Sequence, residues 1–194
     1  RRVAVDEGRL HQGRFDDLIE AASQRCEHPD DAKASARLRA CTTDLAFWEK
    51  AIPEGVLSAG AFPIGRGLSH DGQLEQALPW LLRAVAAQEE AGAAGHPDSQ
   101  GLGRALHWVG DCLVRLDQID EAVPWFERAI AAKRGVEHQE RIDHESLGVS
   151  LHQLGFCYYR RERFEEALPW FEHAVEAAEK GGVEGRVDHH SHGQ

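Results

Sequence analysis

The chain has 194 residues, of which 42% are hydrophobic, and its 33 acidic residues outnumber its 22 basic residues to give a net charge of −11. An acidic surface repels phosphate groups, so nucleic acids and anionic membranes are poor candidates for partners. The longest apolar runs, such as residues 77–82, are far shorter than the roughly 20 residues that span a bilayer. The opening residues are basic but lack the apolar core of a secretory signal.

Residues 1–50 are interpreted as N-terminal helices that form a degenerate repeat or a cap. Residues 13–17 resemble the later segment 162–166, which predicts a helix over residues 15–27 that ends at Pro29. Asp30 or Asp31 is the expected N-cap of the next helix. The apolar residues of that helix follow a coiled-coil-like spacing. They are Ala34, Leu38, Cys41, Leu45 and Trp48.

The rest of the sequence repeats itself every 45 residues. The segment Ala77-Leu78-Pro79-Trp80 recurs at residues 122–125 and 167–170. The same spacing relates three glycines, Gly65, Gly110 and Gly155, and three aspartates, Asp98, Asp143 and Asp188. We therefore assign repeats to residues 51–95, 96–140 and 141–185, and interpret residues 186–194 as the start of a truncated fourth repeat.

Each repeat is predicted to contain two helices. In the third, Asp143 is the expected N-cap, and an apolar stripe runs from Leu147 to Tyr158 before a charged turn at residues 160–163. A second helix is expected from Phe164 to the glycines at 181–182. One such pair cannot bury its apolar stripes alone, whereas stacked pairs can, so the sequence predicts an all-α solenoid.

This pattern resembles the tetratricopeptide repeat family, and its long period is similar to the repeats of kinesin light chains. The residues that carry the resemblance in the third repeat are Leu151, Leu154, Gly155, Tyr158, Ala167, Phe171 and Ala174, with counterparts in the first two repeats. The resemblance implies a right-handed superhelix of stacked antiparallel helix pairs. It also implies a concave groove, lined by the first helices, that binds a peptide or a partner protein.

The residues expected to line this groove lie on the face of each first helix that the core stripe leaves unused. They are Arg66 in the first repeat, Arg104, His107, Asp111 and Arg115 in the second, and His152, Phe156, Tyr159 and Arg160 in the third. Arginine, histidine and aromatic groups favour a ligand with acidic and apolar groups. The alternative is a solvated face on which His107 pairs with Asp111, and Asp111 with Arg115.

The equivalent tryptophans Trp80, Trp125 and Trp170 could form an aromatic ladder, but we favour packing between helices. Cys112 and Cys157 are also one period apart, and no Cys-x-x-Cys motif is present. We therefore expect buried thiols in a reduced, cytoplasmic protein. The excess of arginine over lysine, with much alanine and glycine, suggests a GC-rich and hence bacterial genome.

Catalytic motifs are missing from the sequence: it has no phosphate-binding glycine loop, nucleophile elbow or zinc-protease motif, so we expect neither an enzyme nor a cofactor. A second hypothesis is self-assembly, because the apolar flank of residues 164–180 lacks a following repeat to cover it and would dock on another copy or on the short tail. A third is metal binding by carboxylates and histidines, although their spacing matches no established motif. These histidines are His138, His144, His189, His190 and His192.

Overall fold

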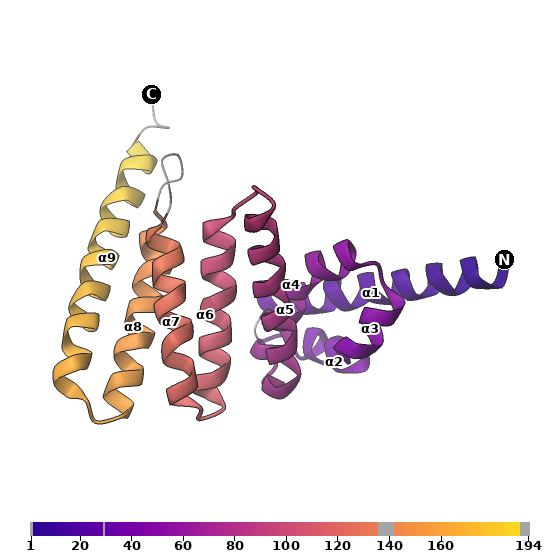
Figure 1. The fold of residues 1–194 in the computed structure, drawn as a ribbon, viewed down its shortest axis with the longest axis horizontal. Coiled ribbons are helices and arrows are strands. Elements are labelled where there is room, and N and C mark those ends of the chain that lie inside the picture. Colours follow the sequence, from indigo (N-terminus) through magenta and orange to yellow (C-terminus); the bar gives the residue numbers. More distant parts are fainter. Residues whose placement is uncertain (1, 29, 136–141, 191–194) are drawn as a thin grey trace. The chain divides into compact units, whose positions relative to one another are not determined.

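A computed structural model describes the backbone of residues 2–28, 30–135 and 142–190, and the side chains from residue 7 to residue 182 within these ranges (Figure 1). Every regular element in these ranges is an α-helix, which confirms the predicted all-α class. The helices form two compact units, Arg1–Glu90 and Ala91–Gln194.

The first unit begins with three helices, α1 (Arg2–Glu27), α2 (Ala32–Ala40) and α3 (Leu45–Ala51). The sequence predicted a single helix where α2 and α3 lie, and that prediction is wrong because a second N-cap interrupts it. Asp31 caps α2 by accepting a hydrogen bond from the Lys33 amide, and Asp44 caps α3 in the same way from the Ala46 amide. α1 also begins well before the expected residue 15.

α1 packs closely against α4 (Glu54–His70) because two glycines of α4 face it. A Cβ atom built on Gly60 would lie 2.8 Å from the ring of Phe15, and one built on Gly67 would lie 2.6 Å from the carbonyl oxygen of Ala22. Contacts this short exclude any larger residue at Gly67, where the neighbour is backbone and cannot rotate away. The two glycines therefore fix the distance between the helices.

The later helices are spaced like the internal repeat of the sequence. The first helices, α4, α6 (Ser99–Arg115) and α8 (His144–Arg160), begin at residues 54, 99 and 144. The second helices, α5 (Leu74–Ala93), α7 (Ile119–Arg134) and α9 (Phe164–His190), begin at residues 74, 119 and 164. Both series keep the 45-residue spacing. Asp143 caps α8 as predicted, and Asp98, one period earlier, caps α6 in the same way.

The turn inside each repeat has the same backbone conformation. Gly72, Asp117 and Glu162 stand at equivalent positions and have φ angles of 78°, 62° and 58°. In each turn the following amide donates to a carbonyl five residues earlier, for example Gln118 N to Leu113 O at 2.8 Å. This left-handed helix ending favours glycine, yet two of the three repeats carry a side chain there.

In the second unit α6, α7, α8 and α9 lie side by side in chain order, with contacts between each neighbouring pair (Figure 1). Their apolar stripes meet in a continuous core. Its fully or almost fully buried members include Leu106, Val109, Cys112, Phe126, Ala129, Leu151, Leu154 and Cys157. Cys112 and Cys157 are buried thiols, as expected.

α9 does not end at Gly181 and Gly182 but continues to His190, so the predicted helix end is wrong. Glycine weakens a helix by about 1 kcal/mol without forbidding it. A helix ends at glycine when that residue adopts a positive φ, and neither of these glycines does. Residues 186–190 therefore continue α9, and residues 191–194 lie outside the described part of the chain.

The three equivalent tryptophans differ in burial. Trp80 is completely buried, and its indole N–H donates to the Thr43 carbonyl at 2.8 Å, which confirms a packing role. Trp125 and Trp170 are half-buried. The Arg128 guanidinium lies 5.0 Å from the centre of the Trp125 ring, so that ring also makes a cation–π contact with an exposed arginine.

Candidate interaction site

Most of the residues predicted to line a groove in the second unit lie on α6 and α8 and reach solvent. Arg104, Arg115, His152, Tyr159 and Arg160 are exposed, and Asp111 and Phe156 are half-buried. α6 and α8 contact one another as first helices of consecutive repeats. We call these seven side chains the α6/α8 face.

On α6 the charges pair along the helix. The carboxylate of Asp111 lies 3.7 Å from the guanidinium of Arg115, four residues later. Burial raises the pKa of the Asp111 carboxyl, and the Arg115 charge and hydrogen bond oppose that change. The pairing expected for a solvated face is therefore present between Asp111 and Arg115, while Arg104 remains exposed at the other end of the helix.

On α8 an arginine joins two repeats. Arg160 donates at 2.8 Å to the carboxylate of Asp117, which lies in the turn that follows α6. The guanidinium of Arg160 also lies 5.8 Å from the centre of the Phe156 ring. The next residue, Arg161, forms an ion pair with Asp120. Tyr159 is 53% exposed, so an aromatic ring stands beside these charges and is available to a ligand.

His107 differs from the residues of this face because its ring contacts the two neighbouring helices. The side chain is half-buried, with its ring centre 5.5 Å from that of Phe126 and Nδ1 3.0 Å from the Ser150 hydroxyl. The expected pairing with Asp111 is replaced by this contact with α8. Burial, reinforced by the positive charge of Lys133, lowers the pKa of the imidazole to about 3, so the ring is neutral near neutral pH.

A buried lysine completes this arrangement. Lys133 of α7 is 1% exposed, and its ammonium donates to the Ser150 hydroxyl and to the Ser146 carbonyl, each at 2.8 Å. Burial lowers the pKa of Lys133 to about 8; Asp143 opposes this change and Arg104 adds to it. This network was not predicted from the sequence, because a lysine on a helix is normally exposed.

A groove opens between α8 and α9, with a volume of about 630 Å³. Its walls are mostly apolar or small, with His152, Gln153 and Glu145 as polar members. The remaining lining residues are Gly148, Val149, Phe171, Ala174, Val175, Ala178, Gly181 and Gly182. The sequence indicated an uncovered apolar flank on residues 164–180, and the exposed Phe164, Leu168 and Val175 agree with it.

Arg66, the remaining predicted residue, lies half-buried on α4 in the first unit. Its positive charge acts on the Cys26 thiol, whose pKa is raised by burial in spite of that charge. Arg66 therefore belongs to the first unit, whereas the α6/α8 face belongs to the second.

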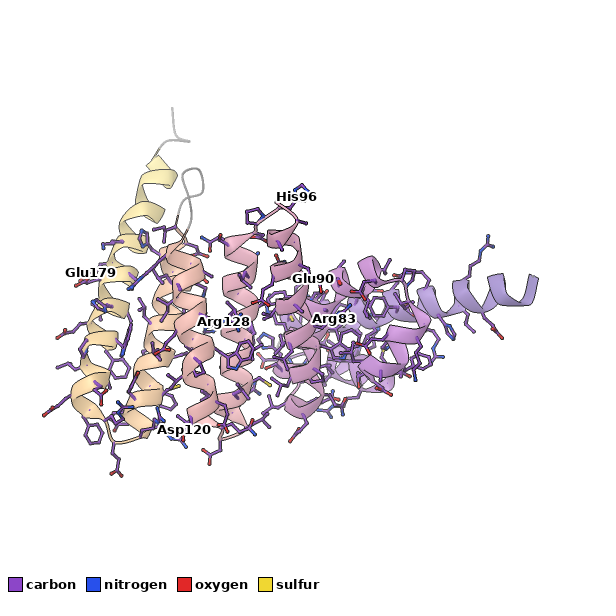
Figure 2. All side chains as sticks on the ribbon, in the orientation of Figure 1. Arg83, Glu90, His96, Asp120, Arg128 and Glu179 are labelled. Carbon is purple, nitrogen blue, oxygen red and sulfur yellow. The ribbon has the colours of Figure 1, made fainter. Side chains whose placement is uncertain are left out.

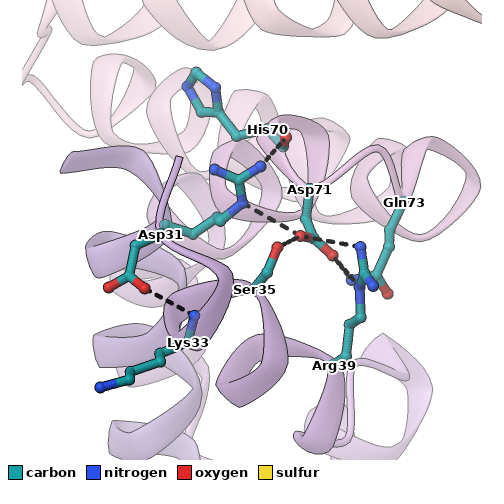
Figure 3. Close-up of polar contacts among 8 residues, drawn as sticks. Asp31, Lys33, Ser35, Arg39, His70, Asp71 and Gln73 are labelled. Carbon is teal, nitrogen blue, oxygen red and sulfur yellow. Dashed lines mark hydrogen bonds and ion pairs between the residues drawn. The ribbon is translucent and has the colours of Figure 1, made fainter. Parts of the chain in front are cut away.

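The first unit also contains a buried carboxylate that the sequence analysis missed (Figure 3). The Asp71 side chain is fully buried and accepts hydrogen bonds from Arg25 at 3.2 Å, Arg39 at 2.8 Å and Gln73 at 2.8 Å, and from the Ser35 hydroxyl. Burial alone would raise its pKa, but these hydrogen bonds outweigh burial and lower the pKa to about 2. The cluster ties α1 and α2 to the turn after α4.

Among the residues that the structure describes, no three histidine, cysteine or acidic side chains are grouped as a metal site would require. His138, and the side chains of His189, His190 and His192, lie outside the described part, so the metal hypothesis stays a prediction. In the described ranges no helix is both long and apolar enough to cross a membrane.

Comparisons with known proteins agree with this geometry. Residues 101–180, from the first turn of α6 into α9, match the family model of the tetratricopeptide repeat. A variant of the nearly identical TPR-like repeats from Podosopora anserina, described as those of a kinesin light chain, superposes with a TM-score of 0.60 at 21% identity. That match covers 87% of this chain and 76% of the other, and it shows a shared fold.

A second structure of such Podosopora anserina repeats has a TM-score of 0.40 at 18% identity, over 90% of this chain and 97% of the other. No curated protein matches this sequence.

Proposed function

Residues 101–180 of this chain belong to the tetratricopeptide repeat family, and from that premise we propose that the protein is a non-enzymatic scaffold for a partner protein or peptide. Tetratricopeptide repeats are generally protein–protein interaction modules. The observation that supports a binding role most directly is the α6/α8 face, where exposed Arg104, Tyr159 and Arg160 project from the first helices of consecutive repeats.

The chemistry of this face favours a partner segment that combines carboxylates with apolar groups. Arg104 and Arg115 are exposed cations in a chain whose net charge is −11, and guanidinium groups bind carboxylates in a bidentate manner. Tyr159 and Phe156 supply aromatic surface next to them. Aromatic residues and arginine are the side chains that contribute most at protein interfaces.

A binding role is favoured over catalysis by the position of a group of side chains that resembles a catalytic set. A serine hydroxyl between a lysine and a histidine is a familiar way to activate a nucleophile. Here, however, Ser150 is completely buried between α7 and α8, with Lys133 at 2.8 Å and His107 at 3.0 Å. A substrate would have to separate the helices to reach it.

We also propose a cellular location and a source for the protein. We place it in a reducing cytoplasm, which the presence of thiols and not disulfides at its four cysteines supports, and the composition favours a bacterial source. Neither point affects the binding argument.

Peptide selection tests the binding role. A random peptide library displayed on phage is selected against the immobilised chain, and the proposal expects peptides enriched in acidic and large apolar residues. Their binding should be lost in the double variant Arg104→Glu, Tyr159→Ala. The matched control is Arg134→Glu, Leu82→Ala, which changes an exposed arginine and an exposed apolar residue that are not members of this face. Equal binding by both double variants would contradict the proposal.

Self-assembly remains a second candidate, supported by the exposure of Phe164, Leu168 and Val175 on α9, each between 56% and 58%. It predicts dimers or larger species at high concentration. Light scattering that shows a monodisperse monomer at high concentration would rule out this candidate.

A further inference from the structure

The open groove between α8 and α9 is the repeat equivalent of a groove that is already filled. One period earlier, the groove between α6 and α7 holds α8, whose Ser146 and Ser150 contact Lys133. Under α8, Ile130 is 4% exposed and Lys133 is 1% exposed. Their equivalents in the open groove are Val175, which is 58% exposed, and Ala178, which is exposed as well.

We infer that the α8/α9 groove binds an amphipathic helix with basic flanks from a partner protein. The seated α8 shows the size of helix that such a groove accepts. α8 has 17 residues, which corresponds to roughly 25 Å of helix at 1.5 Å per residue. This site goes beyond the α6/α8 face, from which it differs in every residue except His152.

The apolar stripe of the incoming helix follows from how this groove differs from the filled one. Ala178 replaces Lys133, which removes the buried ammonium and leaves more space. α8 presents Ser150 to that ammonium and to the His107 ring. In the open groove, His152 stands one period after His107 and is part of the wall, whereas the Ala178 methyl group replaces the ammonium. The partner therefore carries a larger apolar side chain over Ala178, where a polar group would lose its hydration without the ammonium or another charge to replace it.

The acidic residues at the rim of the α8/α9 groove predict the charge of the incoming helix. Glu145 is part of the groove wall. Glu172 and Glu179 are exposed on α9 three residues before and four residues after Val175, so helical spacing puts them on the same side as Val175. Figure 2 shows Glu179 projecting from α9 on the side away from α8. Lysine or arginine flanking the apolar stripe would lie opposite these carboxylates.

The same charges argue against a second copy of this chain as the occupant. The chain carries a net charge of −11, and two copies approaching through an acidic rim repel one another. A basic partner is attracted by that rim.

Fluorescence anisotropy with two labelled peptides tests the inference. Both peptides are helices of about 17 residues with the same leucine stripe; one has lysine flanks and the other has glutamate flanks. We expect the lysine peptide to bind at least about tenfold more tightly at low salt, with the difference shrinking at high salt. Val175→Asp should weaken its binding about tenfold or more, whereas Leu82→Asp, at an exposed leucine of α5, should not change it.

Reversing the rim charges provides a second, independent readout. In the double variant Glu172→Lys, Glu179→Lys the preference should shift toward the glutamate peptide. Both residues are exposed, so circular dichroism should show an unchanged fold. Lack of saturable binding, equal affinity for the two peptides, or full binding by Val175→Asp would overturn the inference. A dimer that Val175→Asp dissociates would make a second copy the occupant instead. None of these outcomes bears on the α6/α8 face, whose variants are different.

Discussion

Lys133 and Ser150 form the central polar contact between α7 and α8: the lysine ammonium donates to the serine hydroxyl at 2.8 Å although Lys133 is only 1% exposed. The other group that accepts from this ammonium is the Ser146 carbonyl, which is also uncharged. A cation in the core that is held by neutral groups loses its hydration without recovering it from an ion pair. This contact therefore fixes how α7 and α8 pack together, but burying the charge lowers the stability of the folded protein.

Replacing the lysine should accordingly stabilise the protein. Lys133→Met keeps the aliphatic volume and removes the charge, so the free energy of unfolding at pH 7 should rise by about 1–3 kcal/mol. The wild-type pKa of about 8 lies below the ordinary 10.5, so between these pH values the unfolded chain binds a proton that the folded chain has released. Wild-type stability should therefore increase from pH 8 to pH 10.5 relative to the variant.

Urea unfolding of both proteins at pH 7 and pH 10 measures this effect. Lys50→Met, which changes an exposed lysine on α3, is the control and should follow the wild-type profile. A Lys133→Met protein that is less stable than the wild type at pH 7 would show that the lysine hydrogen bonds outweigh the buried charge.

His107 should make the protein sensitive to mild acid. Its pKa is about 3 when folded and 6.5 in its ordinary state, so the unfolded chain binds the extra proton between these values. Stability is then fully present above pH 6.5 and falls as the pH drops toward 3. His107→Gln keeps a side-chain acceptor for the Ser150 hydroxyl and does not titrate. Its stability should fall less steeply between pH 6.5 and pH 3, and identical pH profiles would contradict the assignment.

The repeat spacing predicted the helices because each 45-residue copy contains its own caps and turn. Asp98 and Asp143 cap their helices by bonding amides only a few residues away, so local sequence determines them. The break between α2 and α3 is also local, at Asp44, but it was obscured because Leu38, Cys41, Leu45 and Trp48 keep an apolar spacing across it.

The candidate site was harder to predict because burial depends on residues far apart in the sequence. His107 occupies a polar position of α6, and only Ser150, 43 residues later, shows that the ring is covered. Lys133 is buried for the same reason. Asp71 stands in a turn and would be read as exposed, yet its partners Arg25 and Arg39 come from helices 46 and 32 residues earlier.

The Asp71 cluster should stabilise the first unit strongly. Asp71→Asn removes a buried carboxylate that accepts from Arg25, Arg39 and Ser35, and it should lower the free energy of unfolding by about 3 kcal/mol. The control Glu20→Gln breaks an exposed ion pair with Arg37 and should cost less than about 1 kcal/mol.

Low pH should remove the stabilisation that the Asp71 carboxylate provides. The pKa of Asp71 is depressed to about 2 from 3.8, so its stabilisation is complete above pH 3.8 and is lost as the pH falls toward 2. Urea unfolding at pH 4 and pH 2 should show a larger loss for the wild type than for Asp71→Asn. Equal losses would mean that the carboxylate is not the group that titrates.

The repeated turn offers a stabilising substitution. Glu162 has a φ of 58°, a conformation that costs a residue with a side chain about 1–2 kcal/mol. Glu162→Gly removes this strain but makes the unfolded chain more flexible, so the net gain should be about 0.5–1 kcal/mol. The reverse change at the equivalent position of the first repeat, Gly72→Ala, should destabilise by about 1 kcal/mol. Thermal unfolding of the two variants should shift the melting temperature in opposite directions, and shifts of the same sign would refute this explanation.

The unequal burial of the tryptophans predicts unequal costs of removing them. Trp80 is completely buried, with its ring 6.2 Å from that of Phe15, so Trp80→Ala should cost about 3–5 kcal/mol. Trp80→Phe keeps most of the apolar contact but leaves the Thr43 carbonyl without the indole N–H, which should cost about 1–3 kcal/mol. Trp125 is half-buried, so Trp125→Ala should cost only about half as much as Trp80→Ala. Urea unfolding gives all three values, and a Trp125→Ala protein as unstable as Trp80→Ala would mean that the Trp125 ring is covered in solution.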